Sequence, residues 1–163
     1  MYLQWRFPAV PPVLQGENIV RMAWAFSIAL AGLPVALAQA ADIGQVKVAK
    51  GTVTIERSGQ SLAAPPGTRL QTSDVVRTGS DGSVGITMTD NSLLSAGPNS
   101  VLALDRYEFD STTNAGHFDA SLHRGTLAVV SGRLAKQSPD AMAVHTPLAV
   151  LGVRGTEFVV SAR

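Results

Sequence analysis

The sequence predicts an all-β fold, either a compact β-roll or a short β-solenoid of many short strands, with a β-sandwich as the alternative. Three observations support this class. After Asp42, apolar residues alternate with polar residues at a period of two, which is typical of half-buried strands. Clusters of Gly, Pro, Asn and Asp divide the chain into segments of about 8–18 residues, a spacing typical of all-β domains. No segment of about twelve residues in this part carries the apolar stripe of an amphipathic helix.

The alternating segments are expected to be strands that bury one face each. They comprise residues 46–48, 53–55 and 84–88. Continuous apolar runs, each three or four residues long and bounded by turn residues, also occur. They comprise residues 101–104, 127–130, 148–151 and 158–160. Short runs of this kind predict strands that are buried on both faces.

The segments between the strands contain few indications of a helix. Residues 134–142 are the best place for a helical turn or a loop, and Pro139 limits its length. Several strands restart with a Thr directly after a Gly; these pairs begin at Gly51, Gly67, Gly125 and Gly155. A Gly-Thr restart at each coil would suit a β-solenoid, although the intervals between the pairs are irregular.

Charge and composition exclude several classes of protein. The 163 residues contain 13 Lys and Arg against 12 Asp and Glu, a net charge of +1, so the chain lacks the basic surface that nucleic-acid binding requires. The chain has no Cys, which excludes disulfides, thiolate zinc sites and a cysteine nucleophile. Hydrophobic residues make up 45% of the chain, which excludes wholesale disorder.

The first 40 residues have the features of a targeting segment. Residues 22–41 carry no charge, Arg21 precedes them, and two overlapping A-x-A patterns end at Ala38 and Ala40, as at a signal-peptidase site. We therefore expect an N-terminal extension with a signal-peptide helix over residues 1–40, and an all-β periplasmic domain over residues 41–163. The alternative is an uncleaved inner-membrane anchor that leaves the domain facing the periplasm.

The sequence contains none of the common catalytic or nucleotide-binding motifs. Residues 79–85 have the wrong glycine spacing for a phosphate-binding loop and predict a turn instead. His117, His123 and Asp119 are residue types that can bind metal ions. We expect them, and His145, to be solvated or hydrogen-bonded side chains on neighbouring strands. The sequence therefore predicts a protein that is not an enzyme and has no metal site and no cofactor.

Two motifs have both a structural and a functional interpretation. In residues 106–109, Arg-Tyr-Glu-Phe, the two aromatic side chains share one strand face and are expected in the core. An exposed aromatic pair would instead mark a protein or glycan surface. In residues 154–156, Arg-Gly-Thr, the glycine permits a close backbone approach. The arginine is expected to pair with an acid such as Glu157 or Asp105, or to contact a partner.

A series of short fragments spans residues 43–160. They are Gly44-Gln45-Val46, Gly51-Thr52-Val53-Thr54-Ile55, Pro66-Gly67-Thr68-Arg69-Leu70, Asp74-Val75-Val76-Arg77-Thr78-Gly79, Ile86-Thr87-Met88-Thr89-Asp90-Asn91-Ser92, Leu122-His123-Arg124-Gly125-Thr126-Leu127, His145-Thr146-Pro147-Leu148-Ala149 and Val153-Arg154-Gly155-Thr156-Glu157-Phe158-Val159-Val160. In this order they resemble the periplasmic domain of the FecR family, named for the regulator of ferric citrate uptake. The last fragment is the most specific, and residues 90–92 replace an Asp-Gly-Ser turn that is usual in the family.

The resemblance implies an all-β periplasmic fold. In the founding members this domain follows a transmembrane helix and receives a signal from an outer-membrane receptor, and a cytoplasmic segment then controls a sigma factor. Only 21 residues precede the apolar run here, so we expect a stand-alone version of the domain without sigma-factor control. The family-motif positions expected to have a structural or partner-contact role are Gly67, Asp74, Thr78, Gly79, Gly125, Thr146, Pro147, Arg154, Gly155, Thr156 and Phe158.

These observations together predict a non-enzymatic protein-binding or signal-relay module of the bacterial cell envelope. The expected partner is another envelope protein, and strand addition at an open sheet edge is one way in which it would dock. The alternative is an envelope structural or glycan-binding module without a signalling role. Neither function requires a small-molecule cofactor or a nucleic acid.

Overall fold

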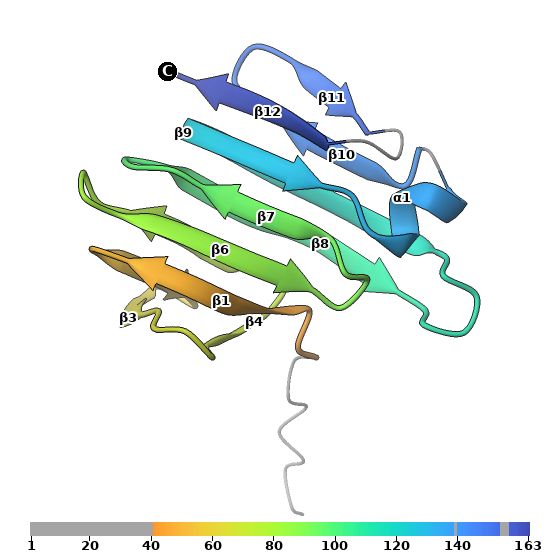
Figure 1. The fold of residues 1–163 in the computed structure, drawn as a ribbon, viewed down its shortest axis with the longest axis horizontal. Coiled ribbons are helices and arrows are strands. Elements are labelled where there is room, and N and C mark those ends of the chain that lie inside the picture. The colour runs from red at the N-terminus through yellow and green to blue at the C-terminus, as the bar shows by residue number, and fades with distance from the viewer. Residues whose placement is uncertain (1–40, 139, 154–156) are drawn as a thin grey trace, which may run out of the picture. The chain divides into compact units, whose positions relative to one another are not determined.

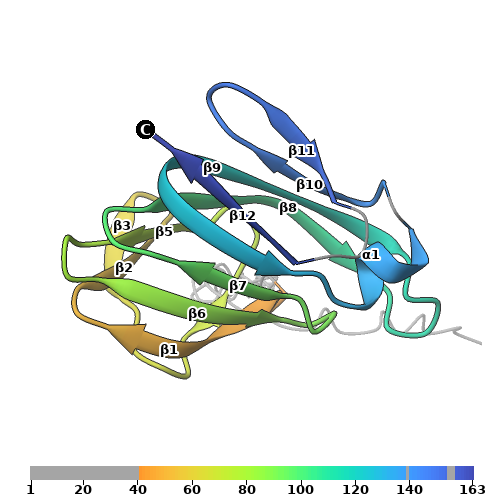
Figure 2. The same ribbon diagram turned by 45° about the horizontal axis from the view of Figure 1, so that its top comes forward.

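The computed structural model describes residues 41–138, 140–153 and 157–163 (Figure 1, Figure 2). These residues form twelve strands and one short helix, so the predicted all-β class is confirmed. All of the described residues belong to one compact unit. The expected signal-peptide helix lies outside the described residues. Within them, no helix has the length and apolar character needed to cross a bilayer.

The strands follow the alternating and apolar segments of the sequence. They are β1 (Gly44–Lys50), β2 (Val53–Arg57), β3 (Gln60–Ala63), β4 (Arg69–Leu70), β5 (Val75–Thr78), β6 (Ser83–Met88), β7 (Leu93–Ala96), β8 (Val101–Phe109), β9 (Gly116–Val130), β10 (Met142–His145), β11 (Val150–Gly152) and β12 (Glu157–Ala162). The helix, α1, spans Arg133–Gln137 and overlaps the segment in which a helical turn was expected.

The strands form one curled half-barrel sheet (Figure 2). Its main path runs β3-β2-β5-β8-β9-β7-β6-β1-β4; β10 and β12 pair with β9, and β11 pairs with β10. Every described pairing is antiparallel except that of β9 with β10. Because stacked solenoid coils would pair in parallel, the sheet corresponds to the predicted roll, and the described Gly-Thr pairs do not mark solenoid coils.

The longest strand, β9, belongs to both layers of the curled sheet. Its first part pairs with β8 and β10, and its second part, from Gly125 onward, pairs with β7 and β12. Gly125 has a φ of +95°, and a Cβ at this position would collide with Ser100. The Ser100 hydroxyl donates to the Thr126 carbonyl at 3.2 Å and accepts from the Thr126 amide at 3.1 Å, which fixes the backbone next to the bend.

The apolar core lies between the two layers. Val84, Ile86 and Met88 of β6 are buried and alternate with partly exposed residues, as the sequence predicted. The rings of Tyr107 and Phe118 meet edge to face, with their centroids 5.5 Å apart. The largest fully buried side chains come from both layers and are Phe118, Ile55, Leu70, Met88, Leu94, Leu102, Leu104, Leu122, Leu127, Leu134, Met142 and Val46.

The burial expected for the continuous apolar runs is confirmed only for residues 101–104, which are buried throughout. The prediction was wrong for the other three runs. Val130 is 39% exposed, Val159 is 72% exposed and Leu148 is 97% exposed. Successive side chains of a strand point to opposite faces, and in residues 127–130 and 158–160 the more exposed side chains alternate with less exposed ones. Residues 148–151 contain no buried side chain. Apolar side chains are therefore left on the surface near the C-terminal end of the domain.

Replacing Gly125 with Ala is expected to lower the free energy of unfolding by about 3 kcal/mol, because the added Cβ must occupy a left-handed conformation and displace Ser100. Gly59→Ala is the matched control, since Gly59 has a φ of +78° but no heavy atom within 4 Å of an added Cβ. Only backbone strain remains in the control, about 1 kcal/mol. Urea denaturation followed by circular dichroism measures both losses, and equal losses would contradict the role of Ser100.

Candidate functional site

Asp74, a family-motif residue, forms a buried ion pair. Its side chain is fully buried, and its two carboxylate oxygens accept hydrogen bonds from Arg57 Nε at 2.8 Å and Nη2 at 2.7 Å. The backbone amide of Gln71 donates a further hydrogen bond to the Asp74 carboxylate at 2.8 Å, and Arg57 also donates to the backbone carbonyl of Arg69. The hydrogen bonds to Asp74 raise the pKa of the Arg57 guanidinium above its ordinary value. The pair therefore fastens the end of β2 to the turn before β5.

Thr78 and Gly79, the next two motif positions, join neighbouring turns. The buried Thr78 hydroxyl donates to the Gly97 carbonyl at 2.6 Å and accepts from the Ser100 amide at 2.8 Å. The Gly79 amide donates to the Thr52 carbonyl at 2.9 Å. Residues 79–82 form a turn before β6, so the predicted turn in this glycine-rich segment is confirmed.

Gly67 holds the turn that precedes β4. It has a φ of +97°, which favours glycine, and its amide donates to the Val46 carbonyl at 2.8 Å. Its own carbonyl accepts a hydrogen bond from Gln45 Nε2 at 3.1 Å. With the bend at Gly125, this places five of the motif positions in contacts that are internal to the domain.

A buried polar network, which sequence reasoning did not find, connects the β6–β7 turn with α1. The Asp90 carboxylate accepts hydrogen bonds from the Ser92 amide at 3.0 Å and the Ser92 hydroxyl at 2.7 Å. It also accepts from the Leu134 amide at 3.4 Å, while the Ser92 hydroxyl accepts from the Gly132 amide at 2.9 Å. The Asp-Asn-Ser motif was the available signal, but its partners lie about forty residues away in the chain.

Tyr107 completes this network from β8. Its hydroxyl accepts from the Asp90 amide at 2.9 Å and donates to the Asp90 carboxylate at 3.2 Å. Burial raises the pKa of Tyr107 to about 12. Phe109 packs partly buried against the core, and the Arg133 guanidinium lies 5.0 Å from its ring centroid. The predicted core position of these two aromatic side chains is therefore confirmed, fully for Tyr107 and in part for Phe109.

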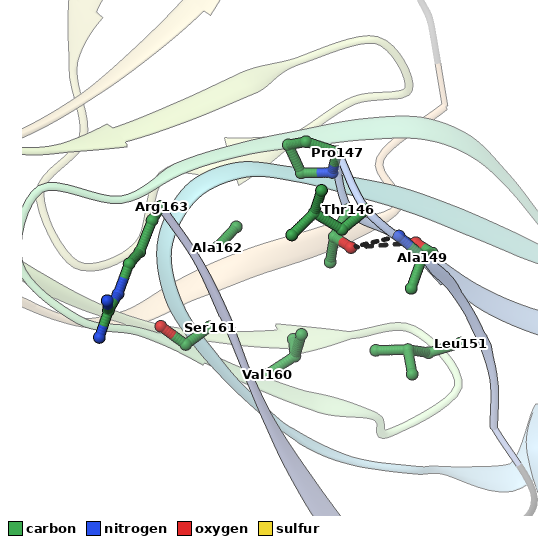
Figure 3. Close-up of a pocket in the computed structure, with 9 residues that line it drawn as sticks. Thr146, Pro147, Ala149, Leu151, Val160, Ser161, Ala162 and Arg163 are labelled. Carbon is green, nitrogen blue, oxygen red and sulfur yellow. Dashed lines mark hydrogen bonds between the residues drawn. The ribbon is translucent and has the colours of Figure 1, made fainter.

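The C-terminal part of the domain forms an apolar groove, here called the C-terminal groove. One wall is the β10–β11 hairpin and the other wall is β12 (Figure 3). The Thr146 hydroxyl donates to the Ala149 carbonyl and accepts from its amide, both at 3.0 Å, and so closes the turn that contains Pro147. Figure 3 shows Leu151 and Val160 facing each other across the groove.

The C-terminal groove contains two adjoining cavities of about 430 Å³ and 410 Å³. The first cavity is lined by residues 146–149, 151 and 160–163, and the second by residues 151–153 and 158–161. The fold thus brings Thr146, Pro147 and Phe158, which are separate in the sequence, to one groove. The remaining motif positions, Arg154, Gly155 and Thr156, lie outside the described residues.

Exposed apolar side chains occur in and beside this groove; Leu148 and Val159 line it, and Val150 is next to the lining residues Ala149 and Leu151 in the chain. Among the described residues, the three most exposed large hydrophobic side chains are Leu148 at 97%, Val159 at 72% and Val150 at 64%. Leu148 and Val150 belong to the hairpin, and Val159 belongs to β12. Exposed apolar side chains that cluster around a hollow mark a surface for interaction with another molecule.

None of the three histidines is buried; His123 is exposed, and His117 and His145 are partly exposed. The parallel pairing of β9 and β10 places His145 beside Ser121. His145 Nε2 lies 3.9 Å from an Asp119 carboxylate oxygen, so His145 approaches this acid rather than His117 or His123. Across residues 41–138, 140–153 and 157–163, no three His, Asp or Glu side chains are grouped so that they could hold a metal ion.

Comparison with known proteins identifies the family. The profile described as FecR protein matches residues 74–163, a region that runs from the buried Asp74 to the C-terminal groove. The match covers more than half of the chain, so the chain belongs to the FecR family. FecR domains take part in signal transduction in the cell envelope. No curated protein and no solved structure matches the chain at a significant level.

Replacing Arg57 with Ala is expected to lower the free energy of unfolding by about 3 kcal/mol, because it leaves the Asp74 carboxylate buried without its counter-charge. The matched control is Arg77→Ala, which removes an exposed ion pair with Glu56 and is expected to cost less than about 1 kcal/mol. Chemical denaturation of both variants tests the difference. Similar losses in the free energy of unfolding for the two variants would show that the buried ion pair contributes no more to stability than the exposed one.

The raised pKa of Tyr107 predicts a loss of stability in alkali. An unfolded tyrosine ionises near a pKa of about 10, whereas Tyr107 in the folded domain ionises at about 12. The contribution of Tyr107 is therefore fully present below pH 10 and is lost as the pH rises from about 10 to 12. Denaturant titrations at several pH values should show a smaller decline over this range for Tyr107→Phe than for the wild type. Parallel declines would contradict the burial of a protonated hydroxyl.

Proposed function

We propose that this chain is a non-enzymatic protein-binding module that relays a signal on the periplasmic side of the bacterial envelope. The observation that carries the proposal is the pair of exposed apolar side chains on the β10–β11 hairpin, Leu148 and Val150, beside the C-terminal groove. They lie inside the region that matches the family. The signal-peptide features of residues 1–40 support export of the domain.

The polar groups of the domain support binding rather than catalysis. The buried side chains of Asp74, Thr78, Asp90, Ser92 and Ser100 all form hydrogen bonds inside the fold. In the described part of the chain, the only charged residue lining the C-terminal groove is an arginine near its end. A catalytic site requires several titratable groups that converge on one cleft.

The aromatic side chains give no support to the glycan-binding alternative. On β8, Tyr107 is only 8% exposed, and Phe109 packs partly buried against the core. The exposed aromatic pair that would mark a glycan surface is therefore not formed at this strand. The apolar hairpin is better suited to a protein partner, because the cores of protein interfaces are enriched in desolvated apolar side chains.

Photo-crosslinking in intact cells tests the proposal. A photo-reactive residue placed at Val150 of the full chain is expected to form an adduct with a different envelope protein, because this side chain is 64% exposed next to the groove. The matched control is Leu62 on β3, which is 43% exposed and lies outside the family match. Mass spectrometry identifies the adducts.

The control decides between the outcomes. An adduct with one envelope protein at Val150 that does not form at Leu62 supports the proposal. No adduct, or the same adducts at both positions, contradicts it. Binding of the purified chain to peptidoglycan, without a protein adduct, would favour the structural or glycan-binding alternative.

A further inference from the structure

The strand β12 is an unusually open edge of the sheet. The described strands that end the sheet are β3, β4, β11 and β12, and the first three have only four, two and three residues. β12 has six residues, and its pairing with β9 is continuous, without a bulge. No other described strand pairs with its outer edge. Proteins usually protect such an edge by shortening it, bending it, or placing Lys or Pro on it, and β12 has none of these features.

The side chains on the outer face of β12 form a charged and apolar series. Glu157, Val159 and Ser161 are exposed, and they alternate with residues that are buried or half-buried. Arg163 follows on the same face, is also exposed, and lies at the end of the groove away from Leu151 (Figure 3). Among the described residues, neither Glu157 nor Arg163 forms an ion pair. Within the described part of the chain, β12 thus has an acid without an ion-pair partner at its first position and a base without one directly after its last.

This series is complementary to itself. When two copies of β12 run antiparallel with Val160 opposite Val160, Glu157 of each copy lies opposite Arg163 of the other. In the same register, Val159 lies opposite Ser161, and the outer face of one strand continues the outer face of the other. A shift by two residues in either direction keeps the faces matched but separates the two opposite charges. One symmetric register is therefore favoured by charge.

We propose that β12 is a self-association edge, through which two copies of this chain pair antiparallel about a two-fold axis at Val160. Backbone hydrogen bonds between the two strands join the sheets, and two Glu157–Arg163 pairs fix the register. The interface is isologous, because the same strand serves both copies. It lies on β12 and needs no other protein, so the inference goes beyond the proposed function and does not depend on it.

Charge reversal tests this register. Sedimentation velocity of the purified full chain is expected to show a reversible dimer. Glu157→Arg and Arg163→Glu, each alone, place like charges opposite each other twice and are expected to raise the dimer dissociation constant about tenfold or more. The double variant, Glu157→Arg with Arg163→Glu, restores two opposite-charge pairs and is expected to return the dissociation constant close to that of the wild type. Gln60→Arg, on the exposed edge strand β3, is the matched control and should leave it unchanged.

Several results would overturn the inference. A wild-type chain that stays monomeric up to high micromolar concentration excludes self-association through β12. The proposed register is excluded if the single reversals leave the dimer dissociation constant unchanged. It is also excluded if the double reversal does not return this constant close to that of the wild type. A monomer that still gives the specific adduct at Val150 would leave the proposed function standing and remove only this inference. A dimer that responds to the charge reversals, without a specific adduct at Val150, would support this inference and contradict the proposed function.

Discussion

The bend of β9 at Gly125 is the constraint on which the rest of the fold depends. Because one strand belongs to both layers, the register of each layer is linked to that of the other, and a slip of one residue would turn an apolar face outward. Ser100 fills the space that a side chain at the bend would occupy, and its amide is held by Thr78. The bend, the neighbouring turn and the end of β5 therefore form one connected unit, and two of the family-motif positions belong to it.

Much of the fold can be predicted from the sequence, because the alternation of apolar and polar residues is a local property. It located β1, β2 and β6, and the dense turn residues predicted the all-β class. Burial of an apolar run depends on whether another layer covers it, which no local pattern specifies. This is why the runs containing Leu148 and Val159 were wrongly expected in the interior. The antiparallel roll was not separable from a solenoid for the same reason, since both produce short alternating strands.

The candidate site was predicted only in part. Asp74 and Thr146 are both family-motif positions, and the sequence did not distinguish their roles. The structure places Asp74 in a buried ion pair and Thr146 at the rim of the C-terminal groove. The Asp90 network was missed, because its partners Tyr107 and Leu134 lie far along the chain. Asn91 has a φ of +68°, and asparagine is among the few residues other than glycine that tolerate this conformation. The Asp-Asn-Ser sequence is therefore compatible with a tight turn at this position.

The order of the strands also bears on how the domain is completed while the chain is being synthesised. The pairings among β1 to β9 need no residue beyond Val130, whereas β10, β11 and β12 pair only with β9 or with one another. A chain that is synthesised from its N-terminus can therefore close most of its core before the last thirty or so residues emerge. The groove and its open edge are assembled last, on a surface that is already folded. The open edge strand β12 is thus exposed without its pairing partner for the shortest time.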